Sequence, residues 1–250
     1  MVNDMPVADL NKKPKQKNQK SKHKLNHLLS ALTSEQFDQL MPELELVELE
    51  AGSQLNAVKG AGQYMHFPLD CVVGMYLTEK NSQPTPIATT GNEGAVGISL
   101  SFLGEAAFNK TEVISAGHAY RLSTETLSTK YRLDSPLQQL LLRYSQILIT
   151  QMQHGASCRR NHTSEQQLCR WLLASLDRLP SLELQITQQM IANKLGMALD
   201  KVIETTQKLQ GMGLIDIGKE NIVIHDRRSI EARACDCYAE IKRESARWLS

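Results

Sequence analysis

The sequence predicts an α+β protein with three consecutive parts: a region of short β-strands, one long helix and a C-terminal winged helix-turn-helix domain. Residues 47–132 predict the first part, because short apolar runs alternate with Gly, Pro and Asn about every ten residues, as in β-sandwiches and barrels. Residues 133–160 carry one apolar stripe at helical spacing. Residues 186–224 contain the signals of two helices, a tight turn and a β-hairpin.

The first 24 residues carry seven lysines against two aspartates, a net charge of +5, whereas the whole chain is only +1. So few of these residues are apolar that the segment cannot offset the entropy of ordering, and we expect a disordered tail. A solubilising role is the favoured interpretation, and a basic arm that contacts phosphate is the alternative. Residues 25–46 predict a short helical region, in which Thr33 or Ser34 can cap a helix.

The region of short strands is expected to end near residue 132, and the long helix to span 133–160. A helix of that length reaches about 42 Å. One apolar stripe over such a length can cover its own domain and still leave surface for a partner, so we expect parallel pairing in a homodimer. Burial of the whole helix within the monomer is the alternative.

The C-terminal part, residues 161–250, begins with an amphipathic helix over 165–179 that ends at Pro180. Thr187 can cap the next helix with its hydroxyl, and Gly196 can take the left-handed conformation that ends it. A second helix is expected over 198–210. Such a pair can place its second helix in the major groove of DNA, although an ordinary helical hairpin on a small sheet remains the alternative.

The residues after the helix pair fit a wing. Ile215 and Ile217 alternate with polar residues, residues 218–221 form a turn, and Ile222 and Ile224 lie on a return strand. A terminal helical segment is expected over 227–244.

Composition excludes several classes of protein. No run of about 18 apolar residues occurs, so no membrane span is expected. The lysine-rich N-terminus is unlike a signal peptide, which predicts a cytoplasmic protein. The sequence has no Gly-rich phosphate loop, nucleophile elbow or paired metal ligands, so we expect neither an enzyme nor a cofactor.

The five cysteines are expected to be free thiols in a reducing compartment, and we predict no metal site. Zinc binding by Cys235 and Cys237 together with Cys158 or Cys169 is the alternative, which a C-x-C pair supports only weakly. No motif supports haem binding by the histidines His66, His118 and His154.

The order of these parts resembles the Crp/Fnr family of transcription regulators over residues 30–240. The likeness rests on YMHFP at 64–68, GNEGAVG at 91–97, RWLL at 170–173, the block 186–215, and DR at 226–227 with ACDCY at 234–238. The resemblance implies a cyclic-nucleotide-binding-like β-roll at 25–132, a dimerisation helix and a DNA-reading domain. It also implies a homodimer that acts on double-stranded DNA with RNA polymerase as a partner.

The ligand residues of that family are altered in this chain. Members that bind cyclic nucleotides hold the ribose with a Gly-Glu pair and the phosphate with an Arg-Ser pair, but here Ile98 follows Gly97 and residues 108–111 contain no arginine. Burying a phosphate without a paired cation is costly. We therefore predict no binding of cyclic AMP in the usual way. The candidate residues for another, unknown small-molecule effector are Gly97, Ile98, Asn109, Lys110 and Thr111.

The helix expected to read DNA also departs from the family pattern, because Leu199 and Glu204 stand where arginines are common. Two lost Arg–guanine contacts would remove roughly 2–6 kcal/mol of discrimination. The basic and acidic residues over 186–230 nearly cancel, whereas DNA-binding domains are usually more basic. The candidate DNA contacts are Thr187, Gln188, Lys194, Ala198, Leu199, Asp200, Lys201, Glu204 and Lys208.

These observations predict a homodimeric DNA-binding transcription regulator. The alternative is a regulator-derived signalling or interaction protein that has lost sequence-specific DNA binding and retains a β-roll that senses a small molecule or a partner. A stand-alone sensor of a small metabolite or nucleotide is a third interpretation, which rests only on the β-roll and Lys110.

Overall fold

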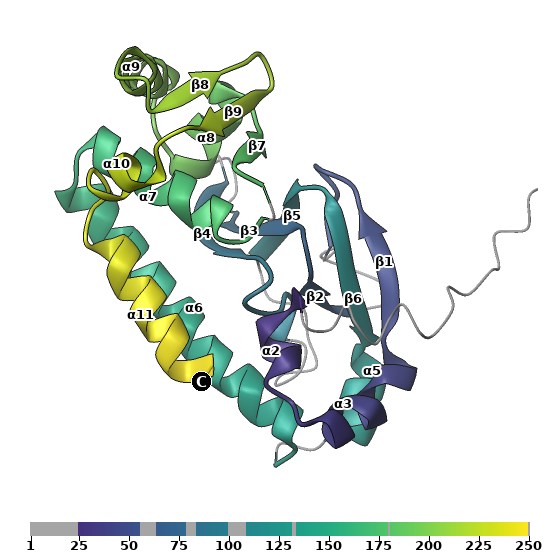
Figure 1. Cartoon of the computed structure of the whole chain (residues 1–250). Coiled ribbons are helices and arrows are strands. Elements are labelled where there is room, and N and C mark those ends of the chain that lie inside the picture. The colour runs from purple at the N-terminus through teal and green to yellow at the C-terminus, as the bar shows by residue number, and fades with distance from the viewer. Residues whose placement is uncertain are drawn as a thin grey trace, which may run out of the picture.

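The computed structural model describes residues 25–55, 64–78, 84–99, 109–131, 134–179 and 181–249. The tail predicted at 1–24 lies outside these residues. An N-terminal domain of two small sheets stands beside one long helix, and a C-terminal domain lies at the upper end of that helix (Figure 1). The described chain is a mixed α and β structure, which confirms the predicted fold class.

The N-terminal domain contains two antiparallel sheets of three strands each. The first has the order β1 (Glu45–Leu49), β6 (Gly117–Ser123), β2 (Tyr64–Pro68), and the second β4 (Thr85–Thr90), β3 (Val72–Leu77), β5 (Asn109–Ser115). Short helices complete the domain: α2 (His27–Ser30), α3 (Ser34–Leu40), the 3₁₀ turn η2 (Met41–Glu43) and α5 (Thr124–Lys130). The predicted Thr33 cap of α3 is confirmed, with Gln36 completing a capping box.

Strand β3 is apolar almost throughout because both of its faces are covered. Cys71 and Val73 pack with Val113 between the two sheets. Val72 and Ile114 instead belong to the core of the C-terminal domain. A sheet that is buried on both faces requires continuous apolar runs rather than alternation. The two domains therefore share a packed boundary at this sheet.

The long helix α6 spans Pro136–Asn161. Ser135 caps it and Pro136 occupies its first turn, so the helix begins three residues later than predicted. Its inner face enters the N-terminal core, where Tyr144 is fully buried and its hydroxyl lies 2.9 Å from Thr90 Oγ1. Gly94 packs directly on that ring, because a Cβ atom at residue 94 would lie 1.9 Å from Tyr144 Cζ. The glycine is thus required by this close approach.

The C-terminal domain packs three helices on a small sheet. The helices are α7 (Ser164–Leu176), α8 (Gln188–Leu195) and α9 (Leu199–Gly211), and the strands β7 (Glu183–Gln185), β9 (Asn221–Ile224) and β8 (Ile215–Ile217) pair in that order. This confirms the predicted helix pair and hairpin. Helix α7 ends at Leu176, ahead of the predicted end at residue 179, because Asp177 already forms its C-cap.

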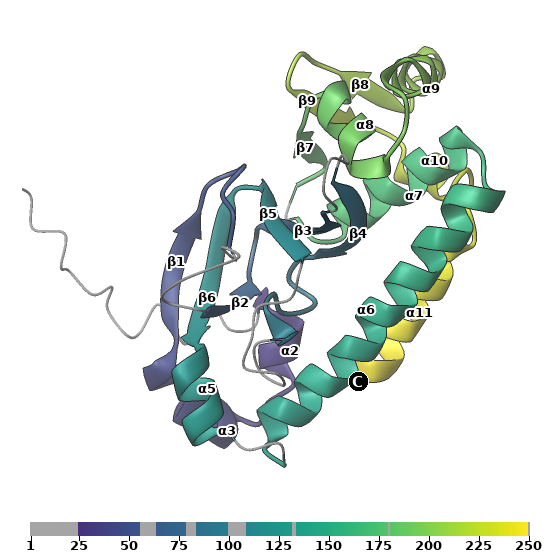
Figure 2. The same ribbon diagram turned by 180° about the vertical axis from the view of Figure 1, so that it is seen from behind.

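The prediction of one helical segment over 227–244 is wrong. The chain forms α10 (Arg227–Glu231), a break at 232–236, and α11 (Cys237–Leu249). The break buries Cys235 and reverses the chain, so that α11 runs back along α6, as both side views show (Figures 1 and 2). In the described part of the chain, no helix combines the length and the apolar character needed to cross a membrane.

Candidate nucleic-acid interface

The angle between α8 and α9 is set by local signals and by a small buried core. The backbone N–H of Met190 donates to Thr187 Oγ1 at 3.2 Å, and Gly196 ends α8 with φ 65°. Gln188 Nε2 donates to Thr206 Oγ1 at 2.7 Å, which ties the start of α8 to the middle of α9. Apolar side chains fill the angle between the helices: Ile191, Ala192, Leu195, Val202 and Leu209.

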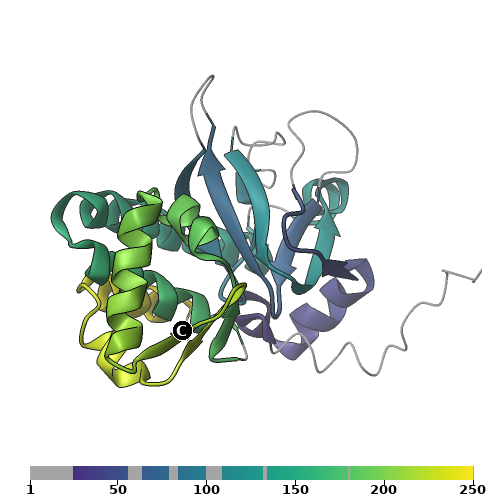
Figure 3. The ribbon, with the colours of Figure 1, turned by 90° about the horizontal axis from the view of Figure 1, so that it is seen from above.

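Helix α9 lies at the outer end of the C-terminal domain, away from the N-terminal sheets, with the β8–β9 hairpin beside it (Figure 1). From above, α9 appears in light green on the near side of that domain (Figure 3). Asp200 and Lys201 are exposed in its first turn, next to the exposed Ala198 and the half-buried Leu199. A helix with one face in solvent and a hairpin alongside has the shape that enters a major groove.

The charges on the outer face of α9 are paired with one another. Lys201 Nζ lies 2.7 Å from Glu204 Oε2, and both side chains are largely exposed. The hydrogen bond from Lys201 lowers the pKa of Glu204, so this carboxylate stays charged at neutral pH. Lys208 Nζ lies 2.5 Å from Glu165 Oε2 on α7. Each lysine of α9 thus has an acidic partner, and the positive field expected of a DNA-reading helix is weak.

Lys194 faces the N-terminal domain rather than the outer surface. Its side chain is only 7% exposed, its Nζ lies 3.2 Å from Glu112 Oε1, and it sits 4.9 Å above the ring of Tyr76. Burial lowers the pKa of Lys194, while Glu112 acts in the opposite direction. In this arrangement Lys194 links the two domains. Its side chain is therefore not among those that α8 and α9 present to solvent.

The predicted ligand residues lie on two segments that flank residues 100–108, which are outside the described part of the chain. Gly97 has φ 94°, and Ile98 after it is buried. Asn109 begins β5. Lys110 Nζ lies 2.7 Å from Glu112 Oε2, and Thr111 is buried with its hydroxyl unpaired among the described residues. The cation considered for an anionic ligand is therefore paired with Glu112, a carboxylate that it shares with Lys194.

A nearly buried ion pair joins the two domains at the end of α7. Arg178 Nε donates to Glu93 Oε1 at 2.8 Å, and its Nη1 donates to the carbonyl of Ala174 at 2.6 Å. The other carboxylate oxygen of Glu93 accepts from the backbone N–H of Gly91 at 3.0 Å. The two side chains are 11% and 12% exposed. Charged residues are rarely buried without a partner, yet sequence patterns alone could not pair two residues 85 positions apart.

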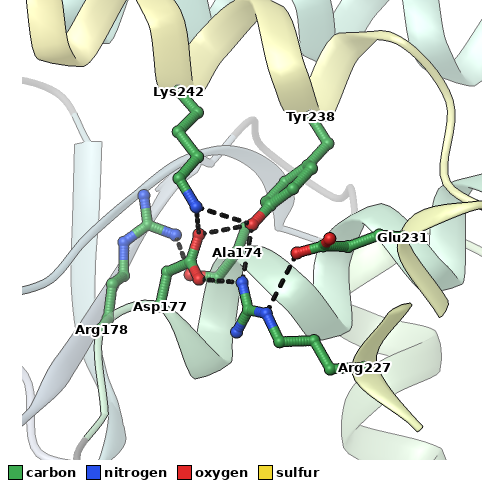
Figure 4. Close-up of polar contacts among 7 residues, drawn as sticks. All are labelled: Ala174, Asp177, Arg178, Arg227, Glu231, Tyr238 and Lys242. Carbon is green, nitrogen blue, oxygen red and sulfur yellow. Dashed lines mark hydrogen bonds and ion pairs between the residues drawn. The ribbon is translucent and has the colours of Figure 1, made fainter. Parts of the chain in front are cut away.

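A second polar cluster ties α7, α10 and α11 together (Figure 4). Asp177 accepts hydrogen bonds from Arg227 and from the hydroxyl of Tyr238, the latter at 2.7 Å, and Lys242 Nζ lies 3.4 Å away. Arg227 also pairs with Glu231 at 3.0 Å. Burial opposes ionisation of Asp177, but the hydrogen bonds from Tyr238 and Arg227 outweigh it and lower the pKa. This cluster anchors the C-terminal helix on the helix-turn-helix domain.

Comparison with known families supports this geometry. Residues 166–233 match the family model of the Crp-like helix-turn-helix domain, which covers α7 to α10. No curated protein matches the chain.

Several solved structures share the fold of the described chain. FixK2 from Bradyrhizobium japonicum superposes with a TM-score of 0.64 at 14% identity, over 77% of this chain and 98% of that one. A Crp/Fnr-family transcriptional regulator from Thermus thermophilus superposes with a TM-score of 0.61 at 16% identity, over 76% of this chain and 98% of that one. The c-di-GMP responsive global regulator CLP of Xanthomonas campestris superposes with a TM-score of 0.60 at 14% identity, over 78% of this chain and 100% of that one.

Proposed function

We propose that this chain is a transcription regulator of the Crp/Fnr family that binds double-stranded DNA as a homodimer and reads it with α9. The observation that carries the proposal is the exposed outer face of α9 beside the β8–β9 hairpin, on a domain that matches the Crp-like model. The exposed candidates for base and phosphate contacts are Ala198, Asp200, Lys201, Glu204 and Lys208. RNA polymerase remains a predicted partner on the basis of the family resemblance.

The homodimer is supported by a stripe on α6 that nothing within the described chain covers. The N-terminal core takes one side of this helix and α11 another, while Leu142 is 62% exposed and Ile149 is 46% exposed. These two residues are seven positions apart, which is the spacing of a coiled-coil seam. A second copy of α6 packed in parallel would bury them, and the dimer would carry two α9 helices, one for each half-site of a palindrome.

The first test is selection of DNA from a random pool by the full chain at near-physiological salt without added ligand. We expect enrichment of a palindrome whose half-sites lie about one helical turn apart. Lys201→Ala is expected to weaken the selected site, whereas Lys130→Ala removes an equally exposed lysine from the N-terminal domain and should leave binding unchanged. If no sequence is enriched, the proposal that this chain reads specific DNA without a ligand is wrong.

We expect that this chain is not controlled by cyclic AMP in the way that is usual for the family members that bind cyclic nucleotides. The side chain of Ile98 offers no acceptor to a ribose, and Lys110 is already paired with Glu112. In calorimetric titrations we expect no saturable binding of cyclic AMP at micromolar concentration, and saturable heat would contradict this. Because the Xanthomonas campestris relative is described as responsive to c-di-GMP, that dinucleotide is a second ligand for the same titration.

One observation favours the alternative, a signalling or interaction protein that no longer reads specific DNA. The lysines of α9 are paired with Glu204 and Glu165, and Leu199 is half-buried at the start of the helix. Weak binding that disappears with salt and shows no sequence preference would support this alternative. The complete helix pair and wing favour the regulator.

A further inference from the structure

Three buried thiols and one imidazole meet where the end of α6 touches the break between α10 and α11. Cys158 lies in the last turn of α6 and His162 directly follows that helix, while Cys235 and Cys237 come from the break and the start of α11. Their ligand atoms all lie within 4.8 Å of one another. The three cysteines are 1%, 4% and 5% exposed. Residues 77 positions apart in the chain thus form one compact set of donors.

The separations are close to those of a tetrahedral zinc site. Zinc–sulfur bonds of about 2.3 Å and zinc–nitrogen bonds of about 2.0 Å place sulfurs about 3.8 Å apart and a sulfur about 3.6 Å from a nitrogen. Cys158 Sγ lies 3.5 Å from Cys235 Sγ, and Cys237 Sγ lies 3.7 Å from His162 Nδ1. The remaining separations are at most 4.8 Å, which exceeds the tetrahedral values by about 1 Å.

The kinds of donor favour a metal over the two other uses of cysteine. Buried thiols can serve as small apolar groups, but that role does not explain why an imidazole nitrogen faces Cys237. A disulfide would join two of the sulfurs at about 2.05 Å and leave the third sulfur and the imidazole without a function. Three thiolates and one imidazole form a complete ligand set for structural zinc, without an open position for catalysis.

A counter-charge lies beside the cluster. Zn²⁺ bound by three thiolates and a neutral imidazole carries one excess negative charge. Arg170 on α7 interacts electrostatically with Cys158 and Cys237, and its buried Nε has no hydrogen-bond partner among the described residues. His162 is held in place through its carbonyl, which accepts from Gln167 Nε2 at 2.8 Å. Such neighbours orient the ligands of a metal site and balance its charge.

We propose that Cys158, His162, Cys235 and Cys237 bind one Zn²⁺ ion in each chain. The ion ties the end of α6 to the segment that follows the winged domain. It holds the two-residue connection at 162–163, which separates α6 from α7, and it fixes the start of α11 against α6. The site thereby sets how the DNA-reading domain is oriented on the helix proposed for dimerisation. Binding of the ion itself does not depend on either proposed function.

The test is elemental analysis of the untagged full chain purified without chelators after growth in zinc-supplemented medium. We expect one equivalent of zinc in the wild type and in Cys169→Ser, which alters an equally buried thiol of α7 outside the cluster. Cys235→Ser and Cys237→Ser are expected to lose most of the metal. Equal zinc content in wild type and cluster variants, or no zinc in the wild type after reconstitution, would overturn the site.

A second measurement on the wild type alone covers the case in which the variants fail to fold. Zinc is removed with a chelator and Co²⁺ is added, and we expect the charge-transfer and intense d–d absorption of a tetrahedral thiolate site. Thiol titration in denaturant with a chelator should then show all five cysteines reactive. Weak octahedral cobalt absorption, or only three reactive thiols in denaturant, would exclude the zinc site, the latter because it indicates a disulfide.

Discussion

Replacing Arg178 by methionine is expected to lower the free energy of unfolding by about 3–5 kcal/mol. Methionine fills much of the volume of the arginine side chain but leaves the carboxylate of Glu93 buried without its cation. The carbonyls of Ala174 and Thr89 also lose the donors that the guanidinium supplies at 2.6 Å and 3.3 Å. An uncompensated buried charge costs far more than the pair itself contributes, so the effect should be large.

Urea denaturation of the full chain measures this effect. Lys208→Met is the matched control, because it breaks the exposed pair with Glu165 and should cost only about 0–1 kcal/mol. Adding Glu93→Gln to Arg178→Met removes the orphaned charge and is expected to restore part of the loss, which a double-mutant cycle quantifies. An Arg178→Met variant as stable as Lys208→Met would show that the pair does not hold the two domains together.

The double substitution Leu142→Glu and Ile149→Glu is expected to convert the proposed homodimer into a monomer. Four glutamates would meet along the seam where two pairs of apolar side chains pack, and like charges at a helix interface repel. Loss of the second α9 removes the gain from simultaneous binding of two half-sites, which is worth about 10²–10⁴ in affinity. Sedimentation velocity measures the oligomeric state, and fluorescence anisotropy measures affinity for the selected palindrome.

The control for this experiment is Thr129→Glu, which adds a carboxylate to an exposed position of α5 in the N-terminal domain. It should leave both the dimer and the affinity unchanged. If the Leu142→Glu/Ile149→Glu variant sediments like the wild type, the proposed seam is wrong, and a dimer would have to use another surface.

Local sequence signals were sufficient to predict most elements of this protein. Thr187 and Gly196 mark the two ends of α8, as predicted, because a side-chain cap and a left-handed glycine act within one helical turn. The apolar period predicted α6 and the alternating isoleucines predicted the wing, for the same reason: each pattern describes which face of one element is buried. The order of these elements was sufficient to predict the fold class.

The tertiary structure alone decided which charged and sulfur-containing side chains meet. Lys194 was predicted to contact DNA because of its position on α8, but its ammonium group pairs with Glu112 of the N-terminal domain. The pairing of Glu93 with Arg178 and the meeting of Cys158 with Cys235 join residues 85 and 77 positions apart. No local periodicity records such contacts, because they depend on how whole elements pack after they form. The break before α11 has the same origin, because the tertiary packing that buries Cys235 overrides the local helix propensity.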